Sequence, residues 1–511
     1  MVEVVRRKNG IEPHAPVMLR LLYSSEFVSF IDVSVQRKQE MSKRSEVLTG
    51  DQMASSLIHK AIYEADNPFD LSLREAFQLL EPQLRPPFPL TIREEPEYFT
   101  LNRAILYGIL TETHLAKVHI KHLHGIVIDG YCFFTSLLCK VVDELYSKLV
   151  ENVKVQLVYV TSEMIDVSAT GVDSLLVALL RQIRGGDFSE ANLWLCSEMV
   201  NLFRGKWECL LEEQPLVLSS ALYVFLRVLS DHCRVSLNSK LEILKQNEIK
   251  FCIRVFRDQF HLCLKIGRDL IRLLQDLVHV PEFQDIWKDL LLVPASFKTP
   301  GFSDVSQLYQ SRTCSRYFLL RITPEMEIHL RFLLTQVKLG SQTRYQLWFG
   351  RKYLNAPEKE TVVIDIVRFI CCAHHPSNDI IHSNVIPRWA VIGWLLKCCT
   401  KNHIEANVKL VLFYDWLFFK EGVDNIMNIE PAILLMVNSL PKYIHMTHNL
   451  LEFLFLVVDH YDIDRKDLIL IGVSSALDVL KRKGVVESFD VLTSCDMLSP
   501  FLKEKLVKLL S

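Results

Sequence analysis

The stretch IGRDLIRLLQDLVHVPEFQDIWKDLL, residues 266–291, shows in one place the pattern that recurs through the chain. Its apolar residues fall three and four positions apart, the spacing that lines one face of an α-helix. They are Ile266, Leu270, Leu273, Leu274 and Leu277 in the first half, and Phe283, Ile286, Trp287 and Leu290 in the second. Pro281 separates the halves, because proline ends one helix and is tolerated in the first turn of the next. The stretch predicts two helices joined by a tight turn.

The same pattern of paired helices follows every few dozen residues, with short turns marked by Pro, Asn or Gly. Glycine is scarce, at 17 of 511 residues, against a usual share of about 7%, which argues against many tight β-turns. No fixed repeat length emerges from the spacing of the pairs. We therefore predict an all-α fold, an irregular helical-repeat solenoid of the HEAT or armadillo kind.

One connection is long enough to divide the helices into two lobes. The segment VPASFKTPGFSDVS, residues 293–306, is weakly apolar and contains two prolines. Such a segment between two periodic regions indicates a loop. We predict a hinge here, with a first helical lobe ending at residue 300 and a second helical lobe at residues 301–511.

The composition excludes several classes of protein. A formal net charge of −2 gives no field along the whole chain that would attract nucleic acid or membrane. No apolar run reaches the roughly 18 residues that a membrane span needs, and the N-terminus lacks the order of a signal peptide. The 13 cysteines contain no CxxC pair, which is typical of free thiols in a reducing compartment. These features predict an intracellular protein that does not contact a membrane.

The chain contains none of the short motifs that mark nucleotide binding, zinc-protease or serine-hydrolase chemistry. The strongest metal candidate is FICCAHHPSND, where Cys371, His374 and His375 could share one face of a helix. Zinc usually takes four such ligands from two elements, and the nearest further thiols are the Cys398–Cys399 pair. We favour a core cysteine and helix-ending histidines here, and predict no metal, no cofactor and no catalytic residue.

A single carboxylate stands out in NIMNIEPAILLMV, residues 425–437, where Glu430 comes immediately before Pro431. It could be a buried acid with a chemical role or a residue at a helix start. A catalytic carboxylate needs a partner acid, base or metal ligand, and none lies nearby at helical spacing. The position before proline predicts that Glu430 caps a helix, where its charge stabilises unpaired backbone N–H groups.

The run from Leu308 to Tyr353 departs from the neutral composition, with eight basic residues against two acids and aromatic residues interleaved. Proteins that bind single strands combine a cationic groove with stacking aromatic residues. In a helical solenoid, however, aromatic side chains more often pack between helices while arginines extend to solvent. We favour this second interpretation and keep the first as an alternative. The candidate partner or nucleic-acid surface consists of Arg312, Arg316, Arg321, Arg344, Arg351 and Lys352.

Several blocks of the sequence resemble one known family and stand in the same order as in its members. They are the opening stretch at 266–291, QSRTCSRYFLLRITPEME at 310–327, HPSNDIIHSNVIPRWAVIGWLL at 375–396, LFYDWLFF at 412–419 and IMNIEPAILLM at 426–436. The family is that of subunit 3 of the Integrator complex. The same subunit is also a component of SOSS, a complex that senses single-stranded DNA. The resemblance runs from about Met53 to about Leu480 and is densest between Asp258 and Pro441. Residues 74–87 and 119–131 are similar to the plant branch.

The resemblance implies a non-catalytic, all-helical scaffold in the nucleus, with the cytoplasm as a further location. Members of the family hold together Integrator, which associates with RNA polymerase II and processes the 3′ ends of small nuclear RNA. In animals they also hold an OB-fold single-strand-DNA-binding protein and a small third SOSS subunit, in DNA repair and the DNA-damage response. The expected partners are these proteins and the other Integrator subunits, with nucleic acid contacted indirectly. The alternative is direct binding of single-stranded nucleic acid through residues 308–353.

Two departures from the family limit what the resemblance implies. Family members are about twice this length, and their C-terminal half carries self-association and contacts with another Integrator subunit. Residues 1–52 match nothing in the family, so the first lobe is expected to span residues 53–300. For residues 1–52 we keep two interpretations, a disordered tail or an extension introduced by the gene prediction.

Overall fold

The computed structural model describes residues 56–60, 65–85, 94–235, 239–355 and 360–510. The leader at residues 1–52 lies outside the described residues. Leu57–Ser511 forms one compact unit. Within the described ranges the regular secondary structure is helical, and the only β-type pairing is two isolated bridges. The prediction of an all-α, solenoid-like fold is confirmed, while the division into lobes near residue 300 stays a prediction.

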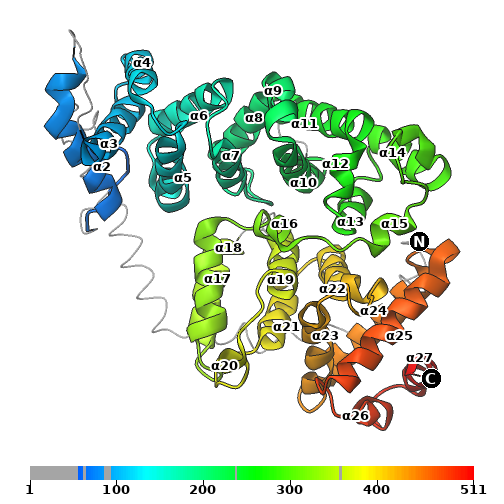
Figure 1. Ribbon diagram of the computed structural model, residues 1–511. Helices are drawn as coiled ribbons and strands as arrows, with labels where there is room; N and C mark the ends of the chain where they lie inside the picture. The colour runs from blue at the N-terminus through cyan, green and yellow to red at the C-terminus, as the bar shows by residue number, and fades with distance from the viewer. Residues whose placement is uncertain (1–55, 61–64, 86–93, 236–238, 356–359, 511) are drawn as a thin grey trace. The chain divides into compact units, whose positions relative to one another are not determined.

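Helices and short turns alternate along the first part of the chain (Figure 1). The α-helices are α2 (Pro68–Leu80), α3 (Glu95–Thr111), α4 (Ala116–Ile126), α5 (Cys132–Leu145), α6 (Glu151–Asp166), α7 (Val172–Leu180), α8 (Glu190–Gly205), α9 (Trp207–Glu213), α10 (Pro215–His232), α11 (Ser239–Asp258), α12 (Phe260–Leu264), α13 (Asp269–Gln275) and α14 (Pro281–Leu292). Two 3₁₀ turns, η3 (Glu81–Leu84) and η4 (Tyr146–Lys148), join some of them.

The second part continues in the same way after the 3₁₀ turn η5 (Pro294–Phe297). Its α-helices are α15 (Ser306–Gln310), α16 (Ser315–Leu319), α17 (Pro324–Gln336), α18 (Thr343–Tyr353), α19 (Val362–Cys372), α20 (Asn378–Ile381), α21 (Arg388–Cys398), α22 (Asn402–Leu417), α23 (Ile426–Ser439), α24 (Ile444–His460), α25 (Lys466–Arg482), α26 (Asp490–Thr493) and α27 (Pro500–Leu510), with η7 (Ile463–Arg465) before α25. Among the described helices, none is both long enough and apolar enough to cross a membrane.

The stretch at 266–291 forms the two predicted helices, α13 and α14. Pro281 opens α14, and Phe283, Ile286 and Leu290 on this helix are buried. A turn at Gly267, where φ is +81°, comes before α13 and shortens that helix relative to its apolar pattern. On α13 two charged side chains, Asp269 and Arg272, are buried as well. The burial of charged side chains on α13 does not follow from an amphipathic pattern.

The polar side chains of α13 belong to a buried charge network between the helices. Its members are Arg227, Arg268, Arg272, Arg321 and Arg368 with Asp231, Asp269, Asp365, Asp415 and Asp424. Each of these side chains is at most 7% exposed. A buried charge is tolerated only when it is paired and hydrogen-bonded. The equal numbers of arginines and aspartates, five of each, allow the buried charges to neutralise one another.

Asp269 contacts several members of this network at once. Its Oδ2 atom lies 2.6 Å from Arg321 Nη2 and accepts a hydrogen bond of 2.6 Å from the Tyr223 hydroxyl. Its Oδ1 atom lies 3.2 Å from Arg272 Nε and 3.3 Å from Arg368 Nη2. Burial opposes the ionisation of Asp269, but the surrounding guanidinium groups prevail and lower its pKa far below the ordinary value.

The network connects helices that are far apart in sequence. Arg227 of α10 lies 2.8 Å from Asp365 of α19. Arg368 of α19 lies 2.9 Å from Asp415 of α22, and Arg268, directly before α13, lies 3.5 Å from the same carboxylate. Figure 1 shows α13 and α16 close to α10, and α19 next to α16. Removal of one partner leaves the other charge buried and uncompensated, so the pairs favour this one arrangement of helices.

The predicted helix cap at Glu430 is wrong. The helix α23 begins earlier, directly after Asn425, whose side chain accepts a hydrogen bond of 2.9 Å from the Met427 backbone N–H. Asparagine is among the strongest N-cap residues, and it sets the helix start despite Pro431, which lies inside the helix. Glu430 instead pairs with Arg388 of α21, at 2.8 Å. The carboxylate holds two helices together.

Candidate partner-binding surface

The fold separates the six candidate residues of the 308–353 run. Five of them are exposed: Arg312 in the connection before α16, Arg316 on α16, and Arg344, Arg351 and Lys352 on α18. The sixth, Arg321, is buried. The run therefore does not present all six side chains to one partner.

Arg321 is not a surface residue, and its inclusion in the candidate surface was wrong. It lies in the turn between α16 and α17, and its side chain is 0% exposed. The guanidinium group binds Asp269 and Asp365 and donates to the Tyr223 hydroxyl. These partners lie outside the run, so counting charge within the run could not detect them.

Arg316 faces a hollow that also contains carboxylates. This hollow has a volume of about 340 Å³ and is lined by Arg316 together with Asp173 of α7 and Glu213 of α9. The Arg316 guanidinium also donates a hydrogen bond of 2.9 Å to the hydroxyl of Tyr317. Because two carboxylates line the same hollow, it is not a cationic groove.

Most aromatic side chains of the run are part of the core. The buried ones are Tyr309, Tyr317, Phe318, Phe349 and Tyr353. Tyr309, for example, stacks on Phe418 with ring centroids 4.3 Å apart. Bases stack on exposed rings, so these five rings are not available to a nucleic acid. Phe332 and Trp348 are 45% and 47% exposed.

Phe332 of α17 and Trp348 of α18 both line an apolar groove between these helices. The groove has a volume of about 430 Å³, and its other lining residues are His329, Leu333, Arg344, Tyr345 and Phe349. We call it the α17–α18 groove. Two further apolar side chains of the same helices, Ile328 and Leu347, are also exposed. Large exposed apolar patches with polar rims mark interaction sites on soluble proteins.

Basic side chains accompany the apolar lining. The Arg344 guanidinium lies over the ring of Tyr345, 4.5 Å from its centroid. Within the described part of the chain, no carboxylate lies within ion-pair distance of Arg344. The two acids of the run are already paired, Glu325 with Lys352 at 2.7 Å and Glu327 with a neighbouring arginine of α17. The groove therefore combines apolar side chains with an unneutralised positive charge.

The histidines of the FICCAHHPSND segment have separate surroundings. The ring of His374 lies 3.5 Å from an Arg331 guanidinium nitrogen, and burial together with that charge lowers its pKa to about 4. His375 Nε2 lies 3.0 Å from the side-chain oxygen of Asn428. In the described ranges, Cys371, His374 and His375 do not bring three ligand atoms together.

The described fold and surface define an all-helical repeat protein with a basic, apolar groove between two of its helices. A family model described as Integrator complex subunit 3 N-terminal matches residues 96–508. The chain is 40% identical to an Integrator complex subunit 3 homolog of Dictyostelium discoideum over 406 residues, 79% of this chain and 26% of that protein. It is 38% identical to Integrator complex subunit 3 of Homo sapiens over 392 residues, 76% of this chain and 37% of that protein. The chain belongs to the Integrator complex subunit 3 family.

The chain spans only part of the length of these relatives. The matches cover 26% of the Dictyostelium protein and 37% of the human one. Residues 308–353, with the α17–α18 groove, lie inside the range that the family model matches. The groove is therefore in the part of the chain that the family shares.

Proposed function

We propose that this chain is a non-catalytic scaffold subunit of the Integrator complex, located in the nucleus and also in the cytoplasm. In this role it supports the 3′-end processing of small nuclear RNA together with RNA polymerase II. The observation that carries the proposal is the family match over residues 96–508. The helical fold is consistent with it, because stacked helix pairs create extended surfaces on which partners assemble.

We place a partner contact at the α17–α18 groove, and its chemistry favours a protein. Pockets that accept large apolar side chains supply most of the affinity in protein interfaces. The groove is lined mostly by apolar and aromatic side chains, among them Phe332 and Trp348. Arg344 at the same site favours acidic residues on the partner, which steer association and fix its orientation. The expected occupant is an Integrator subunit that presents large apolar side chains beside acidic ones.

Affinity purification from cells tests both parts of this proposal. The tagged wild-type chain is compared with Trp348→Ala/Arg344→Glu and with a matched control, Phe501→Ala/Arg482→Glu, which changes exposed residues on α27 and α25. Wild type and control are expected to recover Integrator subunits, and the groove variant to lose at least one of them. If wild type recovers no Integrator subunit, the scaffold role fails. If the groove variant recovers all of them, only the groove assignment fails.

We also propose a second assembly, similar to SOSS, in which the chain holds an OB-fold single-strand-DNA-binding protein and a small third subunit. The support is the family resemblance, and the role would serve DNA repair and the DNA-damage response. The same purification after DNA damage is expected to recover an OB-fold protein with the wild-type chain. Recovery of Integrator subunits without any OB-fold protein would remove this second role and leave the first.

The alternative function is direct binding of single-stranded nucleic acid, and one observation favours it. Trp348, an exposed aromatic residue, lies near basic side chains, with Lys352 5.5 Å from its ring centroid. Titration of the purified chain with a labelled single-stranded oligonucleotide at two salt concentrations decides between the functions. We expect no submicromolar binding. Salt-sensitive submicromolar binding that Arg344→Glu weakens would favour the alternative, because each lost phosphate contact lowers the salt slope by about one.

A further inference from the structure

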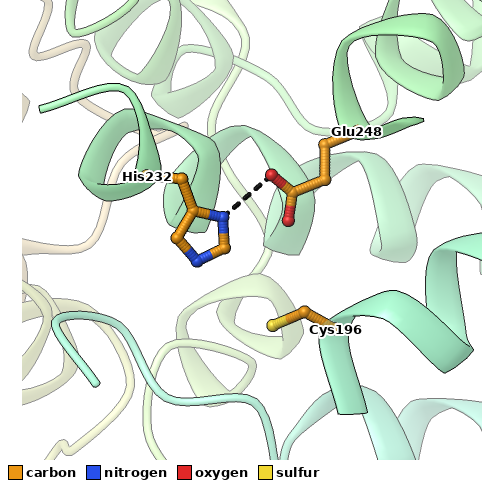
Figure 2. A group of neighbouring side chains, drawn as sticks. All are labelled: Cys196, His232 and Glu248. Atoms are coloured by element: carbon orange, nitrogen blue, oxygen red, sulfur yellow. Dashed lines mark hydrogen bonds and ion pairs between the residues drawn. The ribbon is translucent and has the colours of Figure 1, made fainter. Parts of the chain in front are cut away.

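Three side chains that can bind a metal converge in the core of the first part of the chain. Cys196 is on α8, His232 is the last residue of α10, and Glu248 is on α11. One ligand atom of each residue, a sulfur, a ring nitrogen and a carboxylate oxygen, lies within 4.8 Å of the other two. Figure 2 shows the three side chains pointing toward one another from separate helices. Among the described residues, no other group of this kind is formed.

All three side chains are removed from solvent, and one of their polar atoms has no partner. Cys196 and Glu248 are 0% exposed and His232 is 3% exposed. His232 Nδ1 lies 2.9 Å from Glu248 Oε2, as the dashed line in Figure 2 marks. The second oxygen, Glu248 Oε1, has no hydrogen-bond partner within the described chain. Burying a polar atom without a hydrogen-bond partner costs free energy relative to leaving it in solvent. The His232–Glu248 pair therefore accounts for one carboxylate oxygen of Glu248 and leaves the other without a partner.

The three ligand types fit zinc. Thiolate, imidazole and carboxylate are the groups that bind Zn²⁺ in proteins, at about 2.3 Å for sulfur and about 2.0–2.2 Å for nitrogen and oxygen. Ligand atoms around one tetrahedral ion are then roughly 3–4 Å apart. The ligand atoms of Cys196, His232 and Glu248 lie within 4.8 Å of one another, close to this spacing without a bound ion. The three side chains supply three ligand atoms, and binding of the ion through Glu248 Oε1 would give that oxygen a partner.

The charges of the ion and its three protein ligands also balance. One Zn²⁺ ion, one thiolate, one carboxylate and one neutral imidazole sum to zero, which lowers the cost of burial. Binding releases the thiol proton of Cys196 and the proton shared between His232 Nδ1 and Glu248, because ligands must be deprotonated. No electron is transferred, and the two protons pass to solvent.

We propose that Cys196, His232 and Glu248 bind one zinc ion that fixes α8, α10 and α11 to one another. The site is structural, since the side chains are too deeply buried to meet a substrate. It also supports the buried charge network, because α10 carries two of its members, Arg227 and Asp231. The inference goes beyond the proposed scaffold function and does not depend on it.

Metal analysis of the full chain tests the proposal. The chain is purified without a histidine tag and without chelators, and its zinc content is measured by mass spectrometry. Wild type is expected to hold about one equivalent, and Cys196→Ser to lose most of it. The matched control is Cys263→Ser, which changes an equally buried thiol on α12 outside the group and is expected to keep its zinc. Substitution with Co²⁺ should give a sulfur-to-cobalt charge-transfer band in wild type and in the control, but not in Cys196→Ser.

The wild-type chain alone keeps the proposal testable if Cys196→Ser does not fold. Less than about a tenth of an equivalent of zinc, with no sulfur–cobalt band after refolding with Co²⁺, would overturn the site. Retention of full zinc by folded Cys196→Ser would overturn it as well, because the metal would then be bound elsewhere. Anomalous scattering at the zinc edge from crystals of the wild-type chain should place the ion between α8, α10 and α11.

Discussion

Arginines of the same short run have opposite surroundings in the buried charge network and at the α17–α18 groove. Arg321 is 0% exposed, and two carboxylates and the Tyr223 hydroxyl take up its hydrogen bonds. Arg344 is exposed and lies over the ring of Tyr345. The difference shows that local charge excess does not identify a partner surface. What decides is whether the fold brings a distant carboxylate to each arginine.

The two regions should also respond differently to mutation. In the network, removing one partner leaves a buried charge without compensation, which is expensive. At the groove, the same kind of change leaves a charge in water, where it contributes little to folding. Stability should therefore depend on the network, and partner binding on the groove.

The largest expected effect is on stability when Asp269 is replaced. Asp269→Ala leaves Arg321, Arg272 and Arg368 without a shared carboxylate, so we expect a loss of about 3–5 kcal/mol in the free energy of unfolding. Denaturant melts of the purified chain measure it. The matched control is Asp478→Ala, which removes an exposed carboxylate paired with Arg482. Equal losses in the two variants would show that the buried network does not stabilise the fold.

Two neighbouring aromatic residues of α18 give the next comparison. Phe349 is buried while Trp348 is exposed. Phe349→Ala should cost about 3–5 kcal/mol through lost burial and a cavity. Trp348→Ala should change the free energy of unfolding by less than about 1 kcal/mol. Thermal or denaturant melts of both variants decide the matter, and a reversed order would show that the orientation of α18 is wrong.

Acid should weaken the buried charge network. Burial opposes the ionisation of Asp269 and Asp415, but the guanidinium groups beside them lower both pKa values. The stability they contribute is complete above the unfolded pKa of about 3.9 and is lost as the pH falls below it. We therefore expect the free energy of unfolding to drop steeply below about pH 4. Asp415→Asn, which cannot titrate, should be less stable at neutral pH but show a shallower drop; an unchanged slope would argue against this assignment.

The smallest expected effect on folding is that of Arg344→Glu. Because Arg344 is exposed, its replacement should shift the free energy of unfolding by no more than about 0.5 kcal/mol. Denaturant melts at low and high salt are sufficient to measure this. A loss comparable to that of Asp269→Ala would place Arg344 in a structural contact and remove it from the candidate surface.

Apolar spacing predicted the helices, because it reports a local property of the chain. The pair at 266–291 formed as expected, with Pro281 opening the second helix. Spacing did not predict that Asp269 on the first helix is buried, because the reason lies in arginines from other helices. The prediction for Glu430 failed for a related reason, since its partner Arg388 is 42 residues away in sequence.

The candidate sites show the same limit. Exposed aromatic residues of the run, such as Trp348, could be separated from buried ones only after the packing of α17 against α18 was known. Cys196, His232 and Glu248 gave no sequence signal, because they come from three helices without a motif spacing. Ligand sets assembled by tertiary structure are recognised from geometry alone.

Site-specific photocrosslinking tests most directly whether the α17–α18 groove is the partner-binding region. A benzophenone amino acid replaces Trp348 in one variant and Phe501, an exposed aromatic residue on α27, in the other. Both tagged variants are irradiated in cells and purified, and the crosslinked proteins are identified by mass spectrometry. We expect an Integrator subunit to be crosslinked at position 348 and not at position 501. Recovery of intact Integrator with no crosslink at position 348 would show that the groove is not the partner-binding region.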